Sequence, residues 1–290
     1  MTAACTHGID IGFASLDYLQ ISFLGVVQGI SELLPISSTA HMRIVPALLG
    51  WTDPGSAFSA IMQLAALAAV LSYFAKDVRE LLLGTQIALK RKDYQAPAFR
   101  MAVGIILATI PIGIVGILLS PILNACGSPL RGLNVIAIAC IVMAVLLAIS
   151  ERTCSHARPM ESMRLRDAVL VGLAQVGALI PGVSRSGSTL TGALFLNFKR
   201  EEAARFSFLL GLPAIALAGL KEIWVLWHAH IPLEAWQHLA VGLLVGSVSA
   251  FVAIWALMKF LEKFSTWLFV AYRALLGCFL LLALNQGWLA

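Results

Sequence analysis

The amino-acid sequence predicts an all-α polytopic membrane protein, and its composition and its long apolar segments both point to this class. Of the 290 residues, 60% are hydrophobic and only 12% are charged, and the mean hydropathy is +0.90. These values lie far outside the range of water-soluble domains. Six apolar segments are long enough to cross a bilayer, for which a helix needs about 20 residues. They lie near residues 56–75, 101–122, 133–150, 206–225, 236–258 and 266–286.

Two further apolar segments, residues 17–49 and 168–197, are interrupted by Pro, Gly and Ser, and each half is too short to cross. Non-helical backbone at membrane depth is tolerated only where protein or a water-filled cavity satisfies its polar groups. We therefore expect two re-entrant helix hairpins whose tips meet near the middle of the membrane and line a site.

The two halves of the chain resemble each other. The stretches GVVQGISELLPISST and GLAQVGALIPGVSRSGST share Gly, Gln three residues later, Leu, Pro and a Ser/Thr cluster, at an offset of about 147 residues. We therefore predict a single membrane domain over residues 1–290, made of one repeat at 17–150 and another at 167–286. Each repeat is a re-entrant hairpin plus three transmembrane helices. Because three is odd, the second repeat enters from the opposite face, which makes an inverted-topology repeat.

The distribution of basic residues predicts the orientation. With the N-terminus outside, the linkers that share the inner face hold 15 of the 20 Lys and Arg residues; these are 76–100, 151–167, 199–205 and 259–263. The positive-inside rule assigns this face to the cytoplasm. The net charge of +5 then reflects topology. We expect no nucleic-acid partner, because no basic face is interleaved with aromatic residues.

The first hairpin carries polar residues that suit metal binding. Gln28 and Glu32 are four residues apart, so they share one helical face and can offer oxygens to Mg²⁺ or Ca²⁺. Ionisable groups within the membrane usually mark functional sites. The alternative is that Glu32 is a structural carboxylate paired with Arg43 or another buried cation.

Beyond Pro35, Ser38 and His41 are three residues apart, so a helix that restarts there places both on one face. A hydroxyl next to an imidazole suits nucleophilic or acid–base chemistry. Two simpler explanations stay open: the serine caps the helix, and the histidine is a hydrogen-bonded spacer.

The second hairpin predicts an anion cradle. Pro181 and Gly182 break the helix, and the residues at the new helix start supply hydroxyls and backbone N–H groups. Arg185 lies at the centre, and a guanidinium at membrane depth needs a bound anion or an acidic partner, with a geometry suited to phosphate. Packing by small residues is the alternative, but it does not need an arginine. The cradle residues are Ser184, Ser186, Gly187, Ser188 and Thr189.

The polar motifs of the two hairpins, called cassettes below, together resemble those of the undecaprenyl-pyrophosphate phosphatase family associated with bacitracin resistance. The resemblance covers almost the whole chain. QGISELLPISSTAH at 28–41 matches the (E/Q)xxxE and PxSSTxH motifs, and PGVSRSGST at 181–189 matches PGxSRSG. The resemblance implies an enzyme of the bacterial inner membrane with its site on the periplasmic side. It would hydrolyse undecaprenyl diphosphate to undecaprenyl phosphate and inorganic phosphate, recycling the carrier lipid for cell-wall synthesis and conferring resistance to bacitracin.

The resemblance also implies roles for single residues. Ser38 would attack the terminal phosphorus, His41 would assist proton transfer, and Glu32 would complete the catalytic group. Arg185, with hydroxyls and N–H groups, would hold the phosphates; the supporting residues are Thr39, Ser184, Ser186, Gly187 and Thr189. Glu32 and Gln28 would hold the divalent cation, although the family often carries a second glutamate at the position of Gln28.

Two further residues match family positions outside the cassettes. Gln63, in AFSAIMQLAAL, keeps a family glutamine behind the metal site, whereas Ser59 stands where an acid is usual. Arg273, in AYRALLG, matches an arginine of the last span that pairs with an acid or helps to place the diphosphate.

Other functions compete with hydrolysis. A lipid transporter or flippase also uses inverted repeats and broken helices, alone or combined with a phosphatase. Transport alone would not need the pair of Ser38 and His41. The unrelated histidine-dependent membrane phosphatases are set aside, because only fragments of their motifs occur. The sequence leaves a homodimer, the nucleophile and the preferred lipid length open.

Overall fold

The protein is helical throughout almost all of the described chain. The computed structural model describes residues 5–6, 9–123 and 128–289. Within these ranges the only sheet is an antiparallel pairing of β1 (Cys5–Thr6) with β2 (Ile9–Asp10). Short 3-10 helices lie at Gly12–Ser15 (η1), Pro129–Arg131 (η2), Met160–Ser162 (η3) and Gly177–Leu179 (η4). The predicted all-α class is therefore confirmed.

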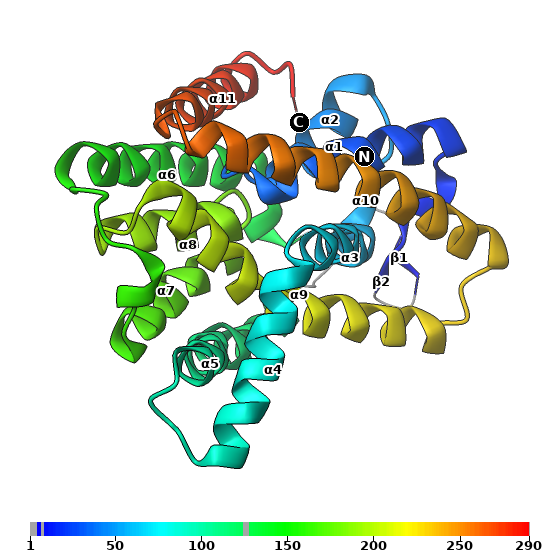
Figure 1. Ribbon diagram of the computed structural model, residues 1–290. Coiled ribbons are helices and arrows are strands. Elements are labelled where there is room, and N and C mark those ends of the chain that lie inside the picture. The colour runs from blue at the N-terminus through cyan, green and yellow to red at the C-terminus, as the bar shows by residue number, and fades with distance from the viewer. Residues whose placement is uncertain (1–4, 7–8, 124–127, 290) are drawn as a thin grey trace.

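Six helices are long and apolar enough to cross a membrane in the part of the chain that the structure describes. They are α3 (Gly55–Tyr73), α5 (Pro97–Leu123), α6 (Leu133–Thr153), α9 (Arg200–His228), α10 (Leu233–Leu261) and α11 (Trp267–Asn285). These are the six predicted spans, each within a few residues of its expected bounds. Figure 1 shows the spans together with the shorter helices of the two hairpins, of which α1 packs on α10, α7 on α5 and α8 on α9.

The surface of these spans is apolar where soluble proteins are polar. Along α5, Ile106, Ile110, Ile114 and Ile117 follow one another at helical spacing and are all exposed. A continuous exposed apolar stripe of this kind is stable only against lipid. The protein is accordingly a multi-pass membrane protein.

Both interrupted segments are broken helices, as expected. The first consists of α1 (Tyr18–Leu33) and α2 (Ser38–Leu49), and the second of α7 (Leu165–Val176), η4 and α8 (Arg185–Phe195). Proline lacks the backbone N–H that a continuing helix needs, so each break follows from its sequence. The two breaks thereby give four helices that are shorter than the six spans.

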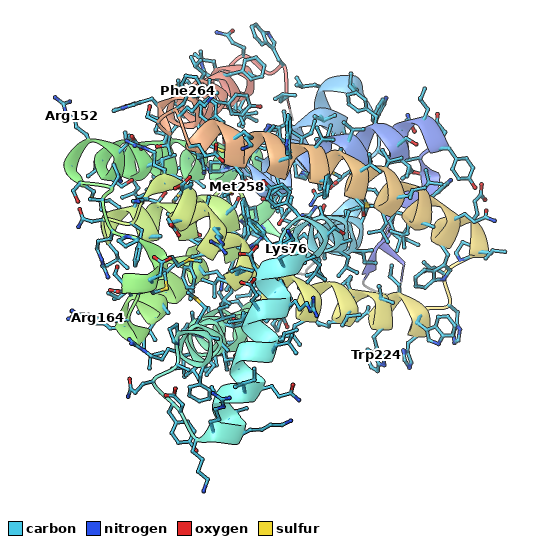
Figure 2. The ribbon with its side chains drawn as sticks, in the orientation of Figure 1. Lys76, Arg152, Arg164, Trp224, Met258 and Phe264 are labelled. Carbon is cyan, nitrogen blue, oxygen red and sulfur yellow. The ribbon has the colours of Figure 1, made fainter. Side chains whose placement is uncertain are left out.

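The linker at 76–100 differs from a simple loop. It contains α4 (Ala75–Arg91), which packs beside α5 and projects from the body of the protein in Figure 1. Its Ala, Leu, Lys, Arg and Gln residues are good helix formers, which explains a helix where charge alone suggested a connection. An ion pair between Asp77 and Arg205 of α9 attaches its first turn. Figure 2 shows Arg152 and Arg164, from another basic linker, pointing outward along one edge.

Glycine allows α1 to lie directly on α10. A Cβ added at Gly29 would stand 2.4 Å from the carbonyl oxygen of Gly246 and 2.0 Å from the hydroxyl of Ser249. Only a residue without a side chain permits this approach, which is how small residues pack helices in membranes. The contact holds the face of α1 that carries Gln28 and Glu32 toward the second hairpin.

Candidate active site

The two hairpin tips meet inside the bundle. The Ser186 hydroxyl lies 3.1 Å from the carbonyl oxygens of both Glu32 and Leu34. The backbone N–H of Gly182 donates to the Thr39 hydroxyl at 3.3 Å. The expected approach of the hairpins is therefore realised by direct hydrogen bonds.

Arg273 of α11 joins the tips from the side. Its Nη1 donates to the carbonyl of Pro35 at 2.9 Å, and its Nη2 donates to the carbonyls of Gly182 at 2.7 Å and Val183 at 3.0 Å. The side chain is fully buried, with 1% exposed. Its contacts are backbone carbonyls, so the acidic partner that the sequence suggested is not among its bonded groups in the described residues. Arg273 thus clamps both breaks in place.

A serine begins each helix beyond the breaks. Ser37 is the N-cap of α2 and accepts from the N–H of Ala40, and Ser184 is the N-cap of α8 and accepts from the N–H of Gly187. Each cap satisfies one N–H of the first turn. The capping role considered for Ser38 therefore belongs to Ser37, and Ser38 is free to face the site.

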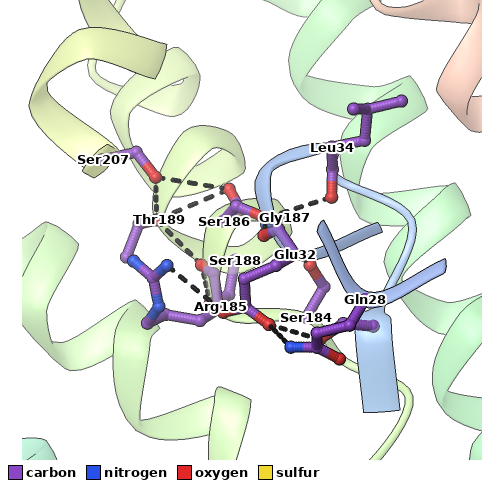
Figure 3. A network of polar contacts seen from close by, with 11 residues as sticks. Gln28, Glu32, Leu34, Ser184, Arg185, Ser186, Gly187, Ser188, Thr189 and Ser207 are labelled. Carbon is purple, nitrogen blue, oxygen red and sulfur yellow. Dashed lines mark hydrogen bonds and ion pairs between the residues drawn. The ribbon is translucent and has the colours of Figure 1, made fainter. Parts of the chain in front are cut away.

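Glu32 is the centre of the polar cluster. Its carboxylate accepts from the hydroxyl of Ser38 at 2.5 Å, from Nε2 of Gln28 at 3.0 Å and from Nη2 of Arg185 at 3.4 Å. Only 5% of Glu32 is exposed. Figure 3 shows its carboxylate between the Gln28 amide and the Arg185 side chain. The sequence had proposed Arg43 as one partner of this acid, but the structure gives that role to Arg185.

Arg185 brings the balancing positive charge from the second hairpin. Its side chain is only 9% exposed, and its one ion pair among the described residues is with Glu32. Its Nε and Nη1 have no hydrogen-bond partner there. The guanidinium lies against Gly211 of α9, where an added Cβ would stand 1.7 Å from Nη1. Arg185 therefore keeps donors for an anionic group while its position is set by Glu32 and Gly211.

The hydroxyls around Arg185 mostly serve the second hairpin itself. Thr189 donates to the carbonyl of Arg185 at 2.8 Å and also bonds the Ser207 hydroxyl of α9. Ser188 donates to the same carbonyl at 3.0 Å. These bonds, several of which appear in Figure 3, brace the turn that carries the guanidinium. Of the expected cradle residues, Ser184, Ser186 and Gly187 also lie in this turn.

His41 faces a different partner from Ser38. Its Nδ1 lies 2.7 Å from the carbonyl of Ser37, and its Nε2 lies 2.6 Å from the Tyr272 hydroxyl of α11. No hydrogen bond joins His41 to Ser38 within the described chain, although both begin the same helix. Sequence reasoning did not single out Tyr272, although a Tyr-Arg pair inside an apolar span was a signal that pointed to it.

Two predicted residues lie apart from the cluster. Gln63 is half-buried in α3, and within the described residues it makes no hydrogen bond to Glu32 or Arg185. Arg43 pairs with Asp53, which also lies 3.7 Å from a guanidinium nitrogen of Arg131. These arginines form a separate group beyond α2.

The donors around Glu32 fit a hard divalent cation only in part. Mg²⁺ and Ca²⁺ prefer several oxygen ligands, and Mg²⁺ often takes one or two carboxylates with the rest from phosphate and water. Glu32 offers a carboxylate, and the buried Oε1 of Gln28 has no hydrogen-bond partner among the described residues. No group of three His, Cys, Asp or Glu side chains gathers in that part of the chain. This set suits a cation held largely by substrate phosphates.

The fold and the cluster define an integral membrane protein with a buried acid, hydroxyl and guanidinium at the meeting point of two broken helices. Sequence comparison places it more closely: the chain belongs to the family described as bacitracin resistance protein BacA, whose profile matches residues 21–279. It is 67% identical to undecaprenyl-diphosphatase 2 of Mesorhizobium japonicum, over 91% of this chain and all of that protein. It is 53% identical to the undecaprenyl-diphosphatase of Gloeobacter violaceus, over 92% and 91% of the two chains.

Proposed function

We propose that this protein is an undecaprenyl-diphosphate phosphatase, which hydrolyses the lipid diphosphate to undecaprenyl phosphate and inorganic phosphate. The observation that carries the proposal is the bond from the Ser38 hydroxyl to the Glu32 carboxylate, 2.5 Å long, next to the buried Arg185. A potential nucleophile, a base and an anion-binding group thus meet in one place. The names of its relatives support the same activity.

Glu32 is placed to activate Ser38. As the Ser38 oxygen attacks the terminal phosphorus, its proton passes to Glu32, and the bond from that phosphorus to the bridging oxygen breaks. Undecaprenyl phosphate then leaves with the electron pair of the broken bond. Water hydrolyses the phosphoserine in a second step and releases phosphate, while Glu32 returns the proton to Ser38. This division of work leaves His41 for other proton transfers.

Arg185 stabilises the charge on the phosphates. Its donors that lack partners among the described residues can bind equatorial oxygens of the attacked phosphoryl group. In a low-dielectric site such contacts strengthen as charge develops in the transition state. The backbone N–H groups at the start of α8 and the hydroxyls of Thr39 and Ser186 extend this environment.

Glu32 and Gln28 would hold the divalent cation, Mg²⁺ or Ca²⁺, which supplies further neutralisation of phosphate charge when it is bound. This role agrees with the orphaned amide oxygen of Gln28. One carboxylate oxygen of Glu32 would then accept from Ser38, and the other would face Arg185 or the cation. The structure already has this division, because Ser38 bonds Oε2 and Arg185 bonds Oε1.

We further propose that the protein lies in the bacterial inner membrane with this site open to the periplasmic side. The concentration of Lys and Arg in the linkers assigned to the cytoplasm supports this orientation. Because three spans separate the two hairpins, the two repeats would have inverted topology in this orientation. Release of the carrier lipid there would return it to cell-wall synthesis and confer resistance to bacitracin.

Phosphate release from undecaprenyl diphosphate by the purified chain in detergent tests the proposal, because detergent removes the two compartments that transport needs. We expect turnover in the parent and a loss of more than about 10³-fold in Ser38→Ala, since a covalent route is removed. Ser31→Ala is the control, because Ser31 is a buried serine of α1 whose hydroxyl donates to the Val27 carbonyl and, among the described residues, to no group of the site. Lipid movement in vesicles without phosphate release would support the flippase instead.

The same assay tests the details of the mechanism. A Ser38→Ala variant that is well folded and keeps a tenth or more of the parental kcat would favour direct attack by water. Chelation followed by Mg²⁺ or Ca²⁺ titration tests the cation, and activity that survives complete chelation would exclude it.

A further inference from the structure

Tyr272 contacts the one nitrogen of His41 that can change its protonation state. Nδ1 lies 2.7 Å from the Ser37 carbonyl, which only accepts hydrogen bonds, so Nδ1 carries a hydrogen. Nε2 lies 2.6 Å from the Tyr272 hydroxyl. In the neutral ring Nε2 accepts from Tyr272, and in the charged ring it donates to Tyr272, so the same contact persists in both states.

The rings are also held parallel. Their centroids are 5.7 Å apart and their planes differ by 11°. Tyr272 precedes Arg273, which is anchored to three carbonyls at both hairpin tips. The tyrosine is therefore fixed relative to the site by its neighbour. Tyr272 is 40% exposed, and its hydroxyl is the group that contacts Nε2 of His41.

We propose that Tyr272 is the proton relay of this site, carrying protons between Nε2 of His41 and the reacting oxygens. The inference rests on the proposed phosphatase function and adds a residue and a path to it. Because Ser38 is bonded to Glu32, His41 is not needed as the base for the nucleophile. The pair of His41 and Tyr272 then serves the leaving oxygen and the hydrolytic water.

The proton transfers balance over one cycle. In the first step Tyr272 gives its hydroxyl proton to the leaving phosphate oxygen and takes a proton from Nε2 of the charged His41. In the second step water attacks the phosphoserine and gives a proton to the Tyr272 oxygen, while Tyr272 passes its own proton to Nε2. His41 ends in its starting state, and one water is consumed for each phosphate released.

Tyr272→Phe in the full-length purified chain tests the relay, because phenylalanine keeps the stacked ring and removes only the hydroxyl. We expect kcat to fall about 10²-fold, the lower end for general acid–base catalysis, with KM changed less than about threefold. Tyr18→Phe is the matched control: Tyr18 bonds Gln237 at 3.1 Å and its ring contacts His238, away from the site. That variant should keep the parental kcat.

A double-mutant cycle separates the relay from simple packing. If His41 and Tyr272 form one proton path, Tyr272→Phe should cost less than about twofold in a His41→Gln background, because the path is already cut. Additive losses would overturn the proposal. Fluorotyrosine at position 272 gives a second measurement, in which kcat should change with the acidity of the phenol while KM does not.

The two levels of inference fail differently. No phosphate release from the parent chain would refute the proposed function. Normal turnover in the parent together with at least half of its kcat in Tyr272→Phe would refute only the relay. Equal kcat for tyrosine and fluorotyrosine would do the same.

Discussion

The two hairpin tips share a backbone conformation but carry opposite chemistry. Ser37 and Ser184, at the offset found between the repeats, both cap their helices with φ of 74°. Positive φ is uncommon outside glycine and is retained where the surroundings stabilise it. The residue after the cap is Ser38 in the first tip and Arg185 in the second. One local structure therefore presents a hydroxyl from one side and a guanidinium from the other.

The preceding helices differ in the same way. In the first, Gln28 donates to Glu32. In the second, the corresponding Gln175 has Leu179 where Glu32 would lie, and neither polar atom of its buried amide has a partner among the described residues. The first helix thus carries both the amide and the acid, whereas the second carries only the amide. The polar cluster is therefore divided between the halves, with the acid and the hydroxyl from the first and the guanidinium from the second.

Removal of the acid should have the largest effect on this arrangement. Glu32→Gln leaves Arg185 without its counter-charge and Ser38 without its base, so we expect kcat to fall about 10³-fold, within the range for loss of acid–base catalysis. The measurement is phosphate release per folded molecule. Glu151→Gln is the control, since Glu151 is also buried but pairs with Arg200 and Thr266 elsewhere. Similar losses in both variants would mean that Glu32 contributes only to folding.

Replacing the arginine of the second hairpin with lysine should reduce activity less than the loss of Glu32. Arg185→Lys keeps the positive charge but loses the planar fork, so kcat/KM is expected to fall about 10²-fold. Arg158→Lys, which alters an arginine paired with Asp167 outside the site, should leave kcat/KM unchanged. Near-parental turnover of Arg185→Lys would show that a point charge is sufficient and would remove the role of two-pronged phosphate binding.

The position of Arg185 can be disturbed without altering it. Gly211→Ala places a Cβ where the guanidinium lies, so the side chain must shift, and we expect about a tenfold loss of kcat/KM because small displacements in active sites are costly. Gly113→Ala in α5 is the control, because no described atom beyond its chain neighbours and its own helix backbone lies within 4 Å of the added Cβ. Unchanged kinetics in Gly211→Ala would show that Arg185 tolerates another position.

The smallest effects should distinguish the two glutamines. Gln28→Leu removes one hydrogen bond to Glu32, and we expect at most about a tenfold loss of kcat, because only the part of that bond's free energy that differs between ground state and transition state changes kcat. Gln175→Leu replaces an amide without a partner and should leave kcat unchanged and the thermal midpoint in detergent equal or higher. A lower midpoint would indicate that the Gln175 amide is hydrogen-bonded in the membrane, for example to water.

Much of the fold was predictable because the membrane imposes simple rules. The six spans follow from length and hydropathy, since an unsatisfied backbone in lipid forces a continuous helix. The two breaks follow from Pro35 and Pro181, and the residues of the site were concentrated at those breaks. The linker helix α4 was missed because its charge pattern was interpreted only as a topological signal. The inverted relation of the two repeats stays a prediction.

The sequence by itself determined which polar residues enter the membrane and at which two breaks they lie, because burying such groups in lipid has so few structural solutions. Only the tertiary structure decided their pairing. Glu32 is bonded to Ser38 and Arg185, His41 to Tyr272, and Arg273 to both tips. These partners are far apart in sequence, and their geometry depends on how α1, α8 and α11 pack. Spacing along one helix cannot specify contacts made between helices.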